Sequence, residues 1–270
     1  MRRCVLLPAL ALLAGVTSAA PAAPAQDTTA AGAAPARTAP ARTVLAIGAH
    51  AGDMELTTGA LLLKARQQGA RVVLLHLTLG EGGNPRLSPE AYGEQKRREA
   101  TRVAEALGAE VMFGPWRDGE LPDDEAARRW VADAIRQVKP TLVVTHWSES
   151  IHKDHAAAHA IVKDAVLLAT LAGVRTAHPP HRGTALWFAE NWEDAEGFRP
   201  YLYVDVTGLV PAWRDAVSRY EFVGGDISAF RYLDYYTALA TLRGAEARRG
   251  QAVAFEIDPT GKRRVLDGVP

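Results

Sequence analysis

The sequence predicts an α/β domain in which a mostly parallel sheet is covered by helices on both faces. From residue 43 onward, short apolar runs alternate with longer segments that have helical spacing. This alternation favours a parallel sheet, because successive parallel strands need a crossover helix between them. No repeat and no second low-complexity segment divides this region. Residues 43–270 are therefore expected to form a single Rossmann-like domain.

Each element has a local signal. The first apolar run is short and unbroken, as in a buried strand, and the helical spacing after it ends at Gly69. Gly108 closes the second helix, and Gly224-Gly225 interrupts the helix-rich last third. The predicted strands are residues 43–49, 71–78, 110–113, 141–145, 184–189 and 201–206. The predicted helices are residues 56–68, 89–107, 123–138 and 155–171, with further helix within 210–248.

The first 20 residues have the pattern of a secretory signal peptide. Arg2 and Arg3 give a positive start, the run 5–16 is apolar, and small residues follow. This run is shorter than the roughly 20 residues that span a bilayer, so no stable membrane insertion is expected. Residues 21–42 are rich in Ala, Pro and Thr, which predicts a disordered linker. The domain is therefore expected in the periplasm or outside the cell.

Composition excludes several classes of function. Lys plus Arg and Asp plus Glu each number 31, so the formal net charge is zero and no nucleic-acid partner is expected. Cys4 is the only cysteine, and it lies in the predicted signal peptide. The mature protein would then have no disulfide, no cysteine nucleophile and no thiolate metal ligand.

Two clusters of histidine and aspartate follow two of the predicted strands. His50 and Asp53 follow the first strand, and His152, Asp154 and His155 follow the fourth. Because the carboxyl ends of parallel strands meet at one edge of the sheet, the clusters should lie close together. Two imidazoles and one carboxylate suit zinc and leave a fourth position open for water. In the alternative interpretation, the aspartates only cap helices.

Other histidines compete for a role. His159 lies four residues after His155, a spacing known from zinc-binding helices, but only alanines stand between them. His146 ends a strand and is a candidate to line the pocket, whereas His76 lies within a strand and is expected to be structural. These alternatives stay open at the level of sequence.

The segments His50-Ala51-Gly52-Asp53-Met54-Glu55 and His152-Lys153-Asp154-His155 correspond to two motifs of a known family. In them the chain resembles the PIG-L/LmbE-like family of zinc-dependent N-acetylglucosaminyl deacetylases, whose motifs are His-Pro-Asp-Asp-Glu and His-Pro-Asp-His. The resemblance extends over residues 43–255. Weaker likenesses lie at Gly80-Glu81-Gly82-Gly83, at residues 97–108 and at residues 203–207.

The resemblance implies roles for individual residues. His50, Asp53 and His155 would bind zinc, and His152 would stabilise the oxyanion or assist the leaving amine. Asp154 would orient a histidine. The implied activity is that of a hydrolase that removes an N-acetyl group from an amino-sugar-containing substrate, a small molecule or a glycan, by attack of water that the zinc activates.

The chain departs from the family at Gly52, where the family has the aspartate that acts as general base. A missing general base typically costs about 10²–10⁴ in rate. Another carboxylate, at Asp154, Glu55 or Glu81, would have to take the role. The alternative is a secreted zinc-containing glycan-binding protein that has lost catalysis.

Overall fold

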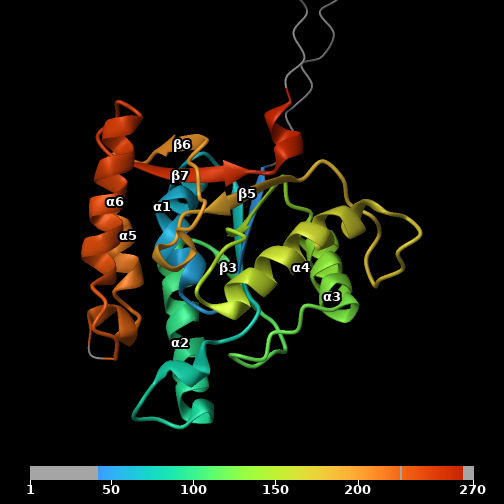
Figure 1. Ribbon diagram of the computed structural model, residues 1–270, viewed down its shortest axis with the longest axis horizontal. Coiled ribbons are helices and arrows are strands. Elements are labelled where there is room, and N and C mark those ends of the chain that lie inside the picture. The colour runs from blue at the N-terminus through green and yellow to red at the C-terminus, as the bar shows by residue number, and fades with distance from the viewer. Residues whose placement is uncertain (1–41, 226, 264–270) are drawn as a thin grey trace, which may run out of the picture. The chain divides into compact units, whose positions relative to one another are not determined.

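Strands and helices alternate along the chain in the computed structural model, which describes residues 42–225 and 227–263 (Figure 1). The strands are β1 (Thr43–Gly48), β2 (Arg71–His76), β3 (Glu110–Phe113), β4 (Leu142–His146), β5 (Ala185–Ala189), β6 (Leu202–Asp205) and β7 (Ala252–Ile257). The α-helices are α1 (Asp53–Gln67), α2 (Pro89–Leu107), α3 (Glu125–Val138), α4 (Lys153–Thr170), α5 (Val210–Val217) and α6 (Tyr232–Glu246). Short 3₁₀ turns lie at Glu81–Gly83, Trp192–Asp194, Glu221–Gly224 and Pro259–Lys262. The predicted signal peptide and all but the last residue of the predicted linker lie outside the described residues.

All seven strands form one sheet in the order β3-β2-β1-β4-β5-β7-β6. The first five are parallel where they pair, and β7 runs antiparallel to both β5 and β6. The prediction of a single α/β domain with a mostly parallel sheet is therefore confirmed. The seventh strand, β7, was not predicted, although Gly250 before it and Asp258-Pro259-Thr260-Gly261 after it are turn signals that bound a short apolar run.

The core is divided by the sheet. Along β1, Val44 and Ala46 pack into one apolar cluster, and the alternate residues Leu45 and Ile47 pack into another. The first cluster includes side chains of α1, α2, α5 and α6, and the second includes side chains of α3 and α4. Figure 1 shows the same division, with α3 and α4 side by side on one face of the sheet. Burial on both faces explains why the run Val44–Ile47 within the strand is apolar without interruption.

Two helices begin earlier than predicted. The N-cap residues of α1 and α4 are Gly52 and His152. Asp53 and Asp154 therefore lie in the first helical turns, where a carboxylate interacts favourably with the helix dipole. The alternative in which these aspartates are N-caps is wrong. In residues 42–225 and 227–263, no helix is both long and apolar enough to cross a membrane.

Candidate metal centre

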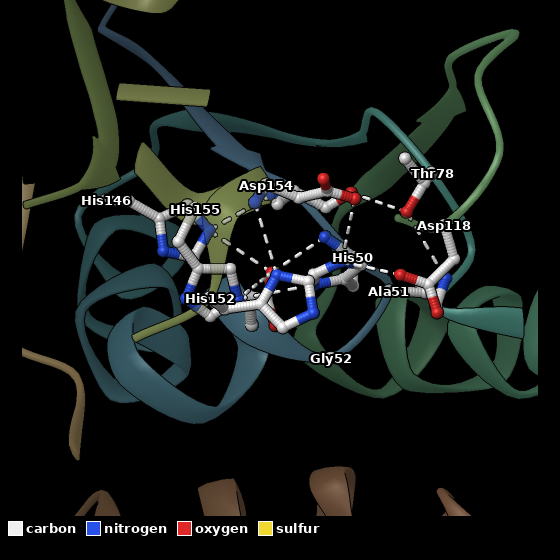
Figure 2. Close-up of polar contacts among 12 residues, drawn as sticks. His50, Ala51, Gly52, Thr78, Asp118, His146, His152, Asp154 and His155 are labelled. Carbon is white, nitrogen blue, oxygen red and sulfur yellow. Dashed lines mark hydrogen bonds and ion pairs between the residues drawn. The ribbon is translucent and has the colours of Figure 1, made fainter. Parts of the chain in front are cut away.

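The two predicted clusters meet at the carboxyl edge of the sheet. β1 and β4 are neighbours there, and the chain reverses its direction of strand addition between them. Ligands of open α/β sheets bind at such a switch point. Figure 2 shows the rings of His50, His146, His152 and His155 gathered at this edge.

The three predicted ligands converge on one small volume. His50 Nδ1 lies 3.2 Å from His155 Nε2 and 3.3 Å from Asp53 Oδ2. His155 Nε2 lies 3.5 Å from the same carboxylate oxygen. Tetrahedral zinc, with bonds of about 2.0–2.1 Å, would hold its donor atoms about 3.3–3.4 Å apart. The donor set and its spacing therefore fit a tetrahedral divalent cation.

His146 also approaches this volume, with its Nε2 3.2 Å from Asp53 Oδ2. That nitrogen accepts the Ala49 backbone N–H at 3.0 Å, and the ring Nδ1 is hydrogen-bonded to Asp194 Oδ2 at 2.9 Å. Both ring nitrogens are thus occupied by the protein. His146 Nε2 is close enough to Asp53 and His155 to share a metal with them, but both of its ring nitrogens already have partners in the protein.

Asp194 holds two of these histidines at once. Its second oxygen, Oδ1, lies 2.9 Å from His155 Nδ1, which leaves His155 Nε2 facing the other ligands. Burial alone would raise the pKa of Asp194, but the hydrogen bonds from His146 and His155 outweigh it and hold the pKa below its ordinary value. A carboxylate behind a ligating histidine fixes its tautomer and ring orientation. Sequence reasoning missed Asp194, although it follows β5 at the same edge.

His50 is oriented from its other ring nitrogen. His50 Nε2 lies 3.1 Å from Asp118 Oδ1 and 3.5 Å from Asp154 Oδ2, so Nδ1 faces the ligand set. The backbone N–H groups of Gly82 and Gly119 hold these two carboxylates, at 2.9 and 2.7 Å. Asp154 therefore lies beside His50, one of the predicted ligands. Asp118 was missed, and its place after β3 was the available signal.

His152 lines the pocket beside the ligands and is half-buried. Its Nδ1 accepts the backbone N–H of Asp154 at 3.2 Å. Burial and the neighbouring His50 lower the pKa of His152, which favours the neutral ring. The remaining nitrogen, Nε2, then carries the proton and is a hydrogen-bond donor.

Gly52 is held in a conformation that favours glycine, with φ at 114°. A Cβ built there would lie 2.7 Å from Phe222 Cζ and 3.7 Å from Lys96 Nζ. Lys96 is buried, and its ammonium donates to the Ala51 carbonyl and lies 4.0 Å from the centre of the Phe222 ring. Burial lowers the pKa of Lys96 to about 8. The space of the missing aspartate is therefore occupied by an aromatic ring and a buried amine.

Two of the carboxylates proposed as substitutes face elsewhere. Glu55 is fully buried and accepts the Tyr220 hydroxyl at 2.6 Å and the Gly52 N–H at 3.2 Å. Glu81 accepts the backbone N–H of Asp118 at 3.0 Å. Neither lines the pocket above the ligands. Both shape the loops that carry other site residues.

Glu193 does line this pocket, together with the aromatic residues Tyr92, Phe222 and Tyr232. Burial, and then the negative charges of Asp53 and Asp194, raise the pKa of Glu193 to about 7. Sequence reasoning did not select this residue, which belongs to the turn after β5.

The competing histidines lie apart from the ligands. His159 Nδ1 is hydrogen-bonded to the His146 carbonyl at 3.0 Å, and its ring packs on Phe188. His76 is buried in β2, where its Nε2 lies 3.3 Å from Glu55 Oε1. Within the described part of the chain, neither belongs to a group of donor atoms close enough to share a metal.

Residues 45–166 match the family model described as PIG-L: GlcNAc-PI de-N-acetylase. This segment is a PIG-L family domain. The match contains both motifs, from His50 to His155, and it confirms the resemblance found in the sequence.

Among curated relatives of this PIG-L domain, a 4-oxalmesaconate hydratase of Pseudomonas putida is 23% identical, over 79% of this chain and 84% of the hydratase. A 1D-myo-inositol 2-acetamido-2-deoxy-alpha-D-glucopyranoside deacetylase of Thermomonospora curvata is 31% identical, over 55% of this chain and 58% of that enzyme. The chain spans about half the length of the curated deacetylases it matches. The solved N,N'-diacetylchitobiose deacetylase of Pyrococcus horikoshii shares the fold, with a TM-score of 0.71 and 20% identity over 82% of this chain and 85% of that one.

Removing a predicted ligand should release the metal. We expect about one zinc per chain in the wild type, and close to none after dialysis in His50→Ala, Asp53→Ala and His155→Ala, because two protein ligands hold zinc far less tightly than three. Elemental analysis of the purified proteins measures this. His152→Ala and His159→Ala are the matched controls and should retain the metal. Full metal content in all three ligand variants would refute the assignment.

Restoring the family aspartate should destabilise this chain. Gly52→Asp places a side chain at a positive φ and a Cβ within 2.7 Å of Phe222. Strain of this kind costs about 1–3 kcal/mol, which corresponds to a melting temperature lower by about 2–12 °C in a domain of this size. Gly52→Ala, which adds the same Cβ without the charge, is the control and should lose a similar amount. An unchanged melting temperature in both variants would contradict the steric account.

Proposed function

We propose that this protein is a zinc-dependent N-deacetylase that removes an acetyl group from an amino-sugar-containing substrate. The observation that carries the proposal is the convergence of His50, Asp53 and His155, with donor atoms 3.2–3.5 Å apart, below a pocket that His152 also lines. The match to the PIG-L family and the names of the deacetylase relatives supply the substrate class.

Each residue of the site has a separate task in this proposal. A zinc ion on the three ligands would activate water and polarise the acetyl carbonyl. Asp194 orients the ring of His155, and Asp118 and Asp154 together orient the ring of His50. His152 donates from Nε2 to the oxygen that gains negative charge when the carbonyl is attacked, a contribution typically worth about 10²–10³ in rate.

Two observations favour a second candidate, a hydratase that adds water to a carbon–carbon double bond. The Pseudomonas putida hydratase aligns along 84% of its own length, whereas the Thermomonospora curvata deacetylase aligns along 58%. The position of the family's general base is also occupied by Gly52. Hydration also needs activated water, but it releases neither acetate nor an amine.

One assay separates the candidates. The purified mature protein, with zinc or after chelation, is offered N-acetylglucosaminyl-inositol, N,N'-diacetylchitobiose and, separately, 4-oxalmesaconate. We expect acetate and free amine in equal amounts from an N-acetylated substrate, lost on chelation and restored by zinc. Consumption of 4-oxalmesaconate without acetate release would replace the proposal by the hydratase. A folded, zinc-loaded protein that is inert on all three would favour the glycan-binding alternative.

We also propose that the chain is exported to the periplasm or secreted. The support is the positively charged start, the short apolar run and the small residues within the first 20 positions. The native protein should begin at or shortly after Ala20 and fractionate outside the cytoplasm, which N-terminal sequencing and cell fractionation check. An intact Met1 on protein recovered from the cytoplasm would contradict this.

A further inference from the structure

The loss of the family's general base leaves the proposed reaction without a proton acceptor. Three carboxylates line the pocket, those of Asp53, Asp118 and Glu193. Asp53 belongs to the predicted ligand set. In Asp118 both oxygens are engaged, Oδ1 with His50 Nε2 at 3.1 Å and Oδ2 with the Gly82 N–H at 2.9 Å. Asp154 is buried, accepts the Gly119 N–H at 2.7 Å and does not line the pocket.

Glu193 differs from Asp118 and Asp154 because, in the described part of the chain, no hydrogen-bond donor holds its carboxylate. Within residues 42–225 and 227–263 its carboxylate oxygens accept no hydrogen bond, and Oε2 lies 3.5 Å from His155 Nδ1, which is itself hydrogen-bonded to Asp194 Oδ1. The side chain is 23% exposed. It is therefore partly shielded from water and still open to the pocket. A proton acceptor needs this combination, because an oxygen already holding a donor has less capacity for another.

The backbone of Glu193 is fixed although its carboxylate is free. The Glu193 N–H donates to Asn191 Oδ1 at 3.3 Å, and the Glu193 carbonyl accepts the Ile151 N–H at 3.1 Å. Asn191 Oδ1 also accepts the Tyr236 hydroxyl at 2.7 Å. Because Ile151 directly precedes His152, this contact ties Glu193 to the second motif. Such anchoring holds a side chain near a reacting group.

The position of the Phe222 ring explains why the proton acceptor is not at position 52. Glu193 and Phe222 line a common hollow with Asp53, and the Phe222 ring occupies the space that a side chain at position 52 would need. The carboxylate that lines this hollow, that of Glu193, therefore belongs to the turn after β5 and not to the N-cap of α1.

We propose that Glu193 is the proton acceptor of this site and replaces the carboxylate absent at position 52. The proposal rests on the proposed deacetylase function. As the water oxygen forms its bond to the acetyl carbon, Glu193 takes one proton from the water. When the C–N bond breaks, Glu193 returns that proton to the leaving nitrogen. The products are the free amine and acetic acid, which ionises to acetate, and Glu193 is again a carboxylate.

The test is Glu193→Gln in the zinc-loaded mature protein, assayed for acetate release. We expect kcat to fall by about 10²–10⁴ with little change in KM, and zinc content and melting temperature to stay at wild-type values. Glu196→Gln is the matched control, because Glu196 is exposed and does not line the pocket. In Glu193→Ala, added formate should restore turnover in proportion to its concentration, which a purely structural role would not produce.

The outcomes distinguish the two proposals. An active wild type with an equally active Glu193→Gln refutes the assignment of Glu193 alone. Loss of zinc from Glu193→Gln also refutes it, because the residue would then act on metal binding. A wild type that releases no acetate from any N-acetylated substrate refutes the proposed function and this assignment with it.

Discussion

Parallel pairing of β1 with β4 is the constraint on which the rest of the site depends. The register sets Val44 against Leu142 and Ala46 against Val144, so the two strands end level with each other. As a result, His50 and His155, 105 positions apart in the chain, come within 3.2 Å. A slip of two residues would move one loop by about 6.6 Å along the strand. No side-chain rotation could then bring the donor atoms back together. The apolar residues on both faces of β1 fix this register, and through it the site.

The second constraint is the charge around the ligands. Asp53, Asp118, Asp154 and Asp194 all lie against the imidazoles of this site and are largely withdrawn from water. Burying carboxylates is costly unless positive charge or hydrogen bonds compensate them. Protonating the histidines would supply charge, but a protonated ring nitrogen cannot bind a metal. A divalent cation supplies the charge and leaves the rings as ligands. Its binding would therefore also stabilise the folded state.

The sequence was sufficient for the parts of the site that lie in short motifs. The strand order indicated that the two clusters share one edge of the sheet, the family resemblance selected His50, Asp53 and His155 as ligands, and the structure brings these three together. Asp118 and Asp194 lie at the same edge but in loops without a motif, so nothing in their local sequence set them apart from other surface carboxylates. Burial and contact, which decide their roles, are properties of the folded chain. The same limit applies to β7, whose pairing depends on partners far away in the sequence.

Gly52 illustrates why a single departure from a motif has to be interpreted together with its surroundings. Taken from the sequence alone, it is a missing carboxylate that one substitution could restore. In the fold, the same position has a positive φ, and Phe222 and the buried Lys96 fill the adjoining space. The backbone and the neighbouring side chains thus fit a glycine at this position, so restoring the aspartate alone would meet both a strained φ and a steric clash. Deacetylation and hydration both require activated water, and they differ in where the water's proton is delivered. With Glu193 as the proposed proton acceptor, the chain would keep the predicted ligands and differ from the family in the feature on which that difference depends.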